Sequence, residues 1–345
     1  MSPLSGRDVG RRLWPFLRLA LAAGMIWYLA SSGTIEWRSL GGLVKSWPLT
    51  LGALAALVAG FAMASWRFCI LTKAQALDVT LGNSLRLTLI GNAANFLLPT
   101  IGSDVVRIWF ASGGHGGRRT EIATIVLLDR VIGLAGILLL PLVLAPFFPG
   151  VVRGSPVFIS VLVVSASAAA ALLGGILVAL SRRGISSAPV QFLLRTFPLR
   201  GYPGRVLDTI HGYRSNGGAL ARALAWSLAA NLCAVGCIIL LQLATNPGTA
   251  HALLGGFLAA LAFVLNNVPI TPGGIGFTEA AVDSLFTIAG MRGGAETMLG
   301  MRVLFLLLAP VGVVLYLRGV RGYLTPTTTA TTTATTTAAA TAPQA

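Results

Sequence analysis

Charged side chains are scarce in this sequence: they make up 10% of its 345 residues, against roughly 25% in ordinary soluble domains. Acidic residues are the rarest, with 10 of them against 25 lysines and arginines. Hydrophobic residues reach 55% and the mean hydropathy is +0.81, which excludes a soluble enzyme and indicates a polytopic membrane protein. The net charge of +15 does not indicate nucleic-acid binding, because the arginines lie in short loops, where positive charge sets topology and contacts anionic lipid.

Cysteine and histidine are also rare, with three of each. Cys69, Cys233 and Cys237 fall inside apolar runs without a Cys-x-x-Cys pair, and the histidines are far apart in the sequence. The pattern indicates neither a disulfide framework nor a metal site, and we expect no cofactor. We also expect no appended catalytic domain, because no block of soluble composition remains outside the apolar runs.

Long apolar runs occupy most of the chain. Those with the roughly 20 residues needed to cross a hydrocarbon core of about 30 Å cover approximately 13–31, 49–71, 121–148, 157–180, 219–244 and 297–317. The first run has the basic flank of a signal peptide but no clear cleavage site, so we expect an uncleaved helix. The sequence predicts an all-α polytopic membrane domain over residues 1–323 and a disordered Thr/Ala-rich tail over 324–345.

Two further apolar segments, 82–111 and 251–290, are interrupted by proline, glycine, asparagine and acidic residues. Their centres read NFLLPTIGSDVVR and NNVPITPGGIGFTEAA. Each predicts a short helix, a break and a second short helix. The sequence does not distinguish a re-entrant hairpin from two full crossings at 251–290, because both leave the chain on the same side.

Clusters of arginine predict the orientation. The loop over 182–214 carries six arginines and others flank both termini, so we expect this loop and both termini in the cytoplasm. Each half of the chain then runs span, span, broken segment, span, with every direction reversed in the second half. This order predicts an inverted repeat, a plan of secondary transporters in which the substrate binds near the midplane where broken helices meet.

Half of the ten acidic residues lie in or beside the breaks and the run EIATIVLLDRVIGL; these are Asp104, Glu121, Asp129, Glu279 and Asp283. A carboxylate costs roughly 2.5–3.5 kcal/mol in lipid, so we expect each to face the bundle interior with a partner. Asp129 and Arg130 point about 100° apart on a helix, so their partners are expected on different helices, with Arg107 and Asp104 as the candidates. Such groups either form structural ion pairs or contact a ligand, and both interpretations stay open.

The helices that restart after the breaks have recognisable first turns. Ser103 is predicted as an N-cap with Asp104 in the first turn, and Glu279 is predicted in the first turn after the second break. Unpaired N–H groups at such helix starts can bind an anion such as a lipid phosphate.

The motifs NFLLPTIGSDVVR, VLLDRVIGL and NNVPITPGGIGFTEAA, in this order, resemble the lysylphosphatidylglycerol synthase transmembrane, or flippase-like, family of bacterial and archaeal membrane proteins. The resemblance extends to about Tyr323. In well-studied relatives this membrane module moves an aminoacylated phospholipid between leaflets, and a separate cytoplasmic domain makes that lipid. The synthase domain has no counterpart in this sequence, so the resemblance does not imply lipid aminoacylation.

Carried over by position, the family pattern predicts a substrate site. Its residues are Asn95, Pro99, Gly102, Asp104, Arg107, Asp129, Arg130, Pro272, Gly273, Gly274, Gly276 and Glu279. The resemblance implies a translocase for an anionic or polyprenyl-linked lipid in the cytoplasmic membrane, in which arginines hold the headgroup and acids orient them or take up protons. Two alternatives stay open: a non-catalytic accessory subunit of a lipid or glycan biosynthesis pathway, and a membrane-embedded transferase.

Overall fold

The computed structural model describes residues 37–97, 102–113, 118–181, 209, 212–214, 216–246, 251–266, 274 and 276–318. The helices in these ranges are α2 (Trp37–Lys45), α3 (Trp47–Lys73), α4 (Leu81–Leu97), α5 (Gly102–Gly113), α6 (Arg119–Leu144), α7 (Pro149–Gly154), α8 (Pro156–Leu180), α12 (Gly217–Thr245), α13 (Ala252–Asn266), α14 (Phe277–Ile288) and α15 (Gly294–Leu317), with a 3₁₀ turn, η1 (Ala145–Phe147), after α6. The described part of the chain contains no strand, which confirms the predicted all-α class.

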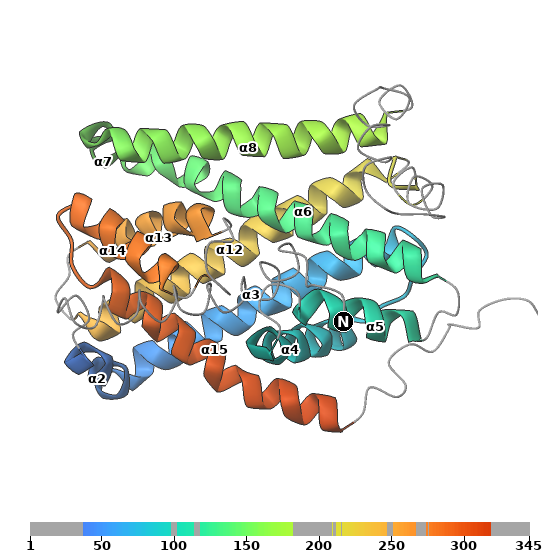
Figure 1. Cartoon of the computed structure of the whole chain (residues 1–345), viewed down its shortest axis with the longest axis horizontal. Coiled ribbons are helices and arrows are strands. Elements are labelled where there is room, and N and C mark those ends of the chain that lie inside the picture. The colour runs from blue at the N-terminus through green and yellow to red at the C-terminus, as the bar shows by residue number, and fades with distance from the viewer. Residues whose placement is uncertain are drawn as a thin grey trace, which may run out of the picture.

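Within the described residues, five helices are long and apolar enough to cross a membrane: α3, α6 with its 3₁₀ turn, α8, α12 and α15. They coincide with five of the predicted spans, and the remaining one, 13–31, lies outside the described residues. The five helices extend along the long axis of the molecule (Figure 1). The chain is therefore a multi-pass membrane protein.

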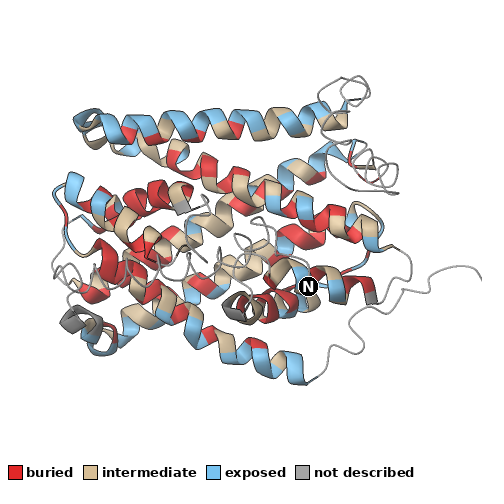
Figure 2. Ribbon diagram, in the orientation of Figure 1, coloured by how far each residue is buried: buried red, intermediate tan, exposed pale blue. Residues whose placement is uncertain are grey.

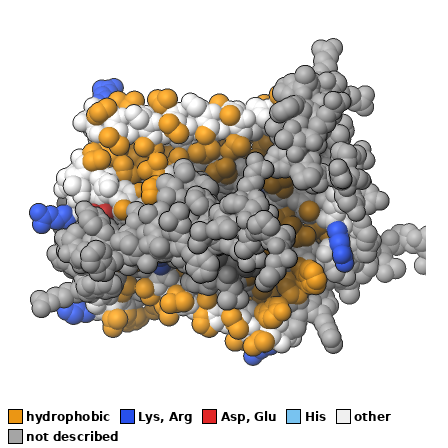
Figure 3. All heavy atoms as spheres, in the orientation of Figure 1, with side chains coloured by type: hydrophobic (Ala, Val, Ile, Leu, Met, Phe, Trp, Pro, Cys, Tyr) orange, Lys and Arg blue, Asp and Glu red, His pale blue; other side chains and the backbone are white. Residues whose placement is uncertain are grey.

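The surface along these helices is apolar. On α8, Val163, Val164 and Leu177 are among the exposed large side chains, and Figure 2 shows exposed residues along most of its length. Figure 3 shows hydrophobic side chains over much of the described surface, with lysine and arginine side chains projecting at both ends of the long axis. A helix that is apolar on all sides and still exposed is expected where lipid replaces water as the solvent.

The short helices form two packed pairs, α4 with α5 and α13 with α14. Their lengths are 17, 12, 15 and 12 residues, so at a rise of about 1.5 Å per residue none reaches 30 Å. The pairs occupy opposite halves of the bundle along its long axis (Figure 1). Each predicted interrupted segment thus contains the two short helices that the sequence predicts.

The tips of the two breaks lie partly outside the described residues. Pro99, Pro272 and Gly273 of the predicted site belong to these undescribed parts. Gly274 and Gly276 are described and have positive φ values of 69° and 80°. Glycine adopts this backbone region without a steric penalty, which explains the glycines that precede α14.

The order of long, short, short and long helices occurs twice, as α3 to α6 and as α12 to α15. Equivalent helices run in opposite directions along the long axis (Figure 1). Their contacts also correspond: α3 packs on α12 at the centre, α4 packs on α15, and α13 packs on α6. These features support the predicted inverted repeat and place helices of both repeats around one interior.

α13 is the most buried of the short helices. Its stretch from Phe257 to Ala262 is at most 1% exposed, because α12, α14, α6 and α8 all pack against it. Gly255 and Gly256 allow the close approach, since a Cβ at Gly256 would lie 2.8 Å from the side chain of Ile239 on α12. The sequence of α13 is apolar on every side, as a helix without a solvent-facing side requires.

Gln242 of α12 is fully buried against Gly255, and its amide has no hydrogen-bond partner within the described part of the chain. A buried polar group without a partner costs about 1–3 kcal/mol. We therefore expect Gln242→Leu to raise the free energy of unfolding by about 1–2 kcal/mol, because it removes that cost and keeps the side-chain volume. Chemical unfolding in a defined detergent micelle measures this change.

Gln75 provides the matched control, because its Nε2 donates a hydrogen bond of 2.9 Å to the carbonyl of Thr209. Gln75→Leu should destabilise the protein where Gln242→Leu stabilises it. If Gln242→Leu also lowers stability, the amide has a structural partner and the expectation is wrong.

The segment before α12 is fixed to the end of α3. The hydroxyl of Tyr213 donates a hydrogen bond of 2.7 Å to the carbonyl of Leu71, and burial raises the pKa of this phenol, so the donor stays protonated. Asn216 Nδ2 donates to the carbonyl of Ala74 at 3.4 Å. These bonds satisfy carbonyls that the end of α3 leaves without helical partners.

Candidate functional site

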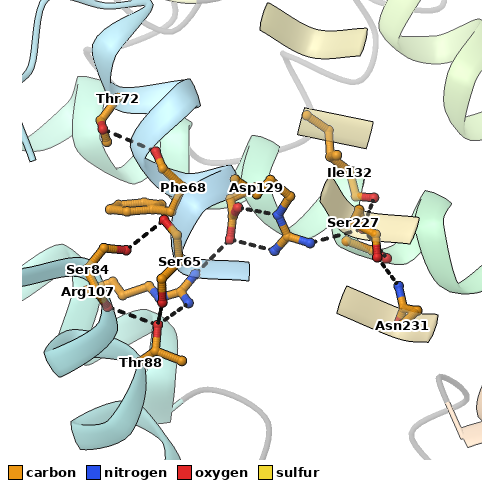
Figure 4. A network of polar contacts seen from close by, with 12 residues as sticks. Ser65, Phe68, Thr72, Ser84, Thr88, Arg107, Asp129, Ile132, Ser227 and Asn231 are labelled. Carbon is orange, nitrogen blue, oxygen red and sulfur yellow. Dashed lines mark hydrogen bonds and ion pairs between the residues drawn. The ribbon is translucent and has the colours of Figure 1, made fainter. Parts of the chain in front are cut away.

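A buried carboxylate lies at the centre of the polar interior. Asp129 of α6 is 2% exposed and accepts two hydrogen bonds from Arg67 of α3, Nε to Oδ1 at 2.7 Å and Nη2 to Oδ2 at 3.0 Å. Arg107 of α5 donates from Nη1 to Oδ2 at 2.7 Å. Figure 4 shows Asp129 surrounded by these polar contacts. One carboxylate therefore holds two arginines from two other helices.

Hydroxyl groups extend this network to more helices. Arg67 Nη1 donates to Ser227 Oγ of α12 at 3.1 Å, and Arg107 Nη2 donates to Thr88 Oγ1 of α4 at 3.1 Å (Figure 4). Thr88 in turn shares a hydrogen bond of 2.9 Å with Ser65 of α3. We call Arg67, Arg107 and Asp129 the central triad, and its contacts connect α3, α4, α5, α6 and α12.

The central triad carries a net positive charge. Its two guanidinium groups face one carboxylate, and the three side chains are at most 11% exposed. Arg107 also lies over the ring of Phe68, 5.2 Å from its centroid, which adds a cation–π contact but no negative charge. Buried charge in a membrane protein is costly unless it is balanced, so one excess positive charge here favours a negatively charged ligand.

Two further ion pairs occupy corresponding positions in the two repeats. Asp104 in the first turn of α5 pairs with Arg130 of the next long helix, α6, at 3.0 Å. Glu279 in the first turn of α14 pairs with Arg302 of the next long helix, α15. Each pair joins a short helix to the long helix that follows it, as the repeat requires.

The two pairs differ in exposure. The side chain of Glu279 is 1% exposed, whereas that of Arg130 is 48% exposed. Arg130 is therefore an accessible cation beside the central triad. The Glu279–Arg302 pair is the more enclosed, since its arginine is 27% exposed.

One backbone N–H at the start of α5 and one at the start of α14 are bonded within the protein. The side chain of Asn95 accepts the N–H of Ser103 at 3.0 Å, and Glu279 Oε2 accepts the N–H of Gly276 at 2.7 Å. The prediction that Ser103 is an N-cap was wrong: α5 begins at Gly102, so Ser103 lies inside the first turn. Since these two N–H groups already have acceptors and the arginines carry full charges, the arginines are better candidates for binding an anion.

The predicted pairing of the neighbouring charges is confirmed. Asp129 pairs with Arg107, and Arg130 pairs with Asp104. Gly102 packs closely nearby, because a Cβ there would lie 2.5 Å from the carbonyl oxygen of Ala94 on α4. The structure thus brings together Asn95, Gly102, Asp104, Arg107, Asp129 and Arg130 at one break and Gly274, Gly276 and Glu279 at the other.

The expectation that all five acids face the bundle interior was too broad. Glu121 pairs with Arg118 at 2.6 Å near the start of α6, where both side chains are at least 30% exposed. It belongs to a surface pair between positions i and i+3, for which no interior partner is needed. Asp283 is half-buried and contacts the backbone of Ala295.

Sequence reasoning missed the arginine partners Arg67 and Arg302 and the hydroxyl of Ser227. Both arginines stand inside apolar runs, FAMASWRFCIL and MLGMRVLFLLL, where an isolated charge already indicates an interior site. An isolated charge within an apolar run indicates an interior position for Arg67 and Arg302 as much as for the acids and for the arginines near the breaks.

A cavity of about 260 Å³ adjoins the central triad between α3, α6, α12 and α15. Arg67, Gly133 and Asn231 line its polar part, whereas Phe61 and Phe305 lie in its apolar part. Two of its four helices come from each repeat. In the part of the chain that the structure describes, no group of three His, Cys, Asp or Glu side chains could hold a metal ion.

A family model described as the lysylphosphatidylglycerol synthase TM region matches residues 16–305. The chain belongs to this family. The matched range includes the central triad, the Asp104–Arg130 and Glu279–Arg302 pairs and the described residues that line the cavity. Comparisons with curated proteins and with solved structures gave no significant match. Membership of the lysylphosphatidylglycerol synthase transmembrane family indicates a membrane module with a lipid-related function.

Proposed function

We propose that this chain is a translocase that moves an anionic or lipid-linked headgroup across the cytoplasmic membrane. The observation that carries the proposal is the excess positive charge of the central triad, which is buried where the two repeats meet. An anionic headgroup at this position would balance the excess charge. Moving the headgroup from water to this site would therefore cost less free energy than moving it into the lipid interior.

In this proposal the predicted site residues have three roles. Arg107 and Arg130 attract the headgroup, and Arg130 meets it first because its side chain is the more exposed. Asp104 and Asp129 orient these arginines through the ion pairs. The remaining positions shape the two breaks or close their helix starts; these are Asn95, Pro99, Gly102, Pro272, Gly273, Gly274, Gly276 and Glu279.

The two short-helix pairs act as re-entrant hairpins in this proposal. Each of the four helices is too short to cross the membrane, and the pairs lie in opposite halves of the bundle (Figure 1). The hairpins then enter from opposite sides, and the Asp104–Arg130 and Glu279–Arg302 pairs attach each one to a long helix. Alternate release of these attachments would open the interior to one side at a time.

The orientation follows from the basic side chains at the two ends. The end where α3, α8 and α15 finish carries Lys73, Arg118, Arg119, Arg214, Arg222 and Arg318. The opposite end carries Lys45, Arg153 and Arg292. By the positive-inside rule, the first end faces the cytoplasm, and the C-terminus after α15 lies there as well.

Arg107→Gln tests the proposal with little risk to the fold. Asp129 keeps its two bonds to Arg67, so the variant removes the excess charge without leaving a carboxylate unpaired. We expect translocation of fluorescent phosphatidylglycerol to fall at least about tenfold, which corresponds to the loss of about 1.4 kcal/mol of headgroup binding. The assay compares purified protein in proteoliposomes, with surface-selective quenching of the fluorophore.

Arg222→Gln is the matched control, because this exposed arginine of α12 bonds, among the described residues, the carbonyl of Gly218, one turn before it on the same helix. It should translocate the lipid as wild type does. If the wild-type protein moves none of the anionic lipids tested, the translocase proposal is wrong, and an accessory subunit of a lipid or glycan biosynthetic enzyme becomes the better description.

A further inference from the structure

The cavity beside the central triad is large enough for a ligand. Its volume of about 260 Å³ far exceeds the roughly 10–15 Å³ that a single water molecule needs. The residues of α3 that line it recur at helical spacing, from Leu57 through Gly60, Phe61 and Ala64 to Arg67. Ten residues of helix extend about 15 Å, so the cavity follows one side of α3 over nearly half of that helix.

One end of the cavity can donate hydrogen bonds. Within the described part of the chain, Arg67 uses three of its five N–H groups in bonds to Asp129 and Ser227, which leaves two for a ligand. Asn231 Nδ2 uses one N–H in a bond of 2.8 Å to the carbonyl of Ser227 and keeps the other. Gly133 keeps space beside the guanidinium, because a Cβ there would lie 3.1 Å from Arg67 Nη1 and 3.3 Å from Nη2.

The rest of the cavity is apolar. Leu57, Ile137, Ala234 and Met301 line it together with the rings of Phe61 and Phe305, whose centroids are 5.9 Å apart. A polar end with donors and an apolar remainder match an amphiphile, with its headgroup at Arg67 and its chain beside the rings.

The lining contains a cation and no carboxylate among the residues that the structure describes. The nearest carboxylate belongs to Asp129, and both of its oxygens already accept bonds from arginine. An ammonium group entering the cavity would lose its hydration and meet Arg67 instead of a counter-ion. The rings of Phe61 and Phe305 do not replace a counter-ion, because an aromatic ring attracts an ammonium group far more weakly than a carboxylate would.

We propose that this cavity binds the phosphate headgroup of an amphiphile that carries no ammonium group, and that it discriminates against aminoacylated lipids. The inference rests on the proposed function, because it names the ligand class and gives the headgroup a binding position at Arg67, the arginine of the central triad that lines the cavity. The proposed ligand differs from the aminoacylated lipid that the family name suggests. A lysyl ester would add positive charge to a site that already has an excess of positive charge.

Equilibrium binding to the full chain in detergent tests this inference without requiring translocation. The probes are dioleoylphosphatidylglycerol, its lysyl ester and dioleoylphosphatidylcholine, each measured by native mass spectrometry or by the shift in melting temperature. We expect phosphatidylglycerol to bind at least tenfold more tightly than either of the other two lipids. Equal or tighter binding of the lysyl ester would overturn the proposal.

Two variants locate the binding without changing any charge. Ala234→Leu fills the cavity, and Gly133→Ala adds a methyl group beside the guanidinium of Arg67. Each should weaken phosphatidylglycerol binding at least fivefold, while Ala170→Leu on the exposed side of α8 should leave it unchanged. Unchanged binding in both cavity variants would also overturn the proposal.

The two proposals fail in different ways. Selective, variant-sensitive binding by a protein that moves no lipid would refute the translocase and leave the cavity assignment in place. Translocation of phosphatidylglycerol that persists in a well-folded Ala234→Leu variant would refute the cavity assignment and leave the translocase in place.

Discussion

Replacing Asp129 with asparagine is expected to lower the free energy of unfolding by about 3–5 kcal/mol, the range observed when a buried ion pair loses one partner. Asp129 is the shared counter-ion of Arg67 and Arg107, so the variant leaves two guanidinium groups buried near each other without a carboxylate. The asparagine amide can accept a hydrogen bond but cannot neutralise either charge. Chemical unfolding in detergent, together with the yield of monodisperse protein, measures the effect.

Removing one of the stranded cations should recover part of this loss. The double variant Asp129→Asn, Arg67→Gln is expected to be more stable than Asp129→Asn alone, because a single buried guanidinium group remains. Glu121→Gln is the control, since it breaks a half-exposed pair and should cost less than about 1 kcal/mol. A cost near that small value for Asp129→Asn would show that the arginines have other counter-ions.

Gly312→Val is expected to destabilise the protein by about 2–3 kcal/mol through overpacking. Gly312 of α15 lies directly against α4: a Cβ there would collide with the carbonyl oxygen of Leu89 and lie 3.0 Å from the Cβ of Ala93. A backbone carbonyl cannot rotate away as a flexible side chain can, so the two helices would have to separate. The measurement is the midpoint of thermal unfolding in detergent.

Gly236→Val on α12 is the matched control, because a Cβ at Gly236 meets no atom of the described residues within 4 Å. It should change stability by less than about 1 kcal/mol, within the range of helix propensity differences in exposed positions. If Gly312→Val were as mild as this control, α15 would be free to move relative to α4, and the close contact between the repeats would not be a fixed feature.

The close contact at Gly312 matters for the proposed mechanism, because α4 belongs to the first repeat and α15 to the second. Arg302, which holds Glu279 of the other short-helix pair, stands on the same α15 helix. A movement of α15 would therefore act on both pairs of short helices. This arrangement offers a physical route by which opening on one side is coupled to closing on the other.

Several site features were predictable because they depend only on local geometry. Asp129 and Arg130 are neighbours in the sequence and therefore point in different directions on any helix. Their adjacency alone predicted that their partners lie on different helices. The cap of α5 was not predictable in the same way. Its acceptor is Asn95 on the preceding helix, so the position of Ser103 depends on how α4 and α5 pack together.

The amino-acid sequence by itself determined the class of the protein, five of the six predicted spans, the two interruptions and the reversed order of the halves, because hydrophobic length, proline, glycine and the distribution of arginine act locally along the chain. Only the tertiary structure decided that Arg67 joins Asp129, 62 positions away, that Arg302 joins Glu279, and that a cavity lies beside them. The physical reason is that charge balance and the space between helices are properties of several helices packed together, and helical periodicity within one segment does not specify its neighbours.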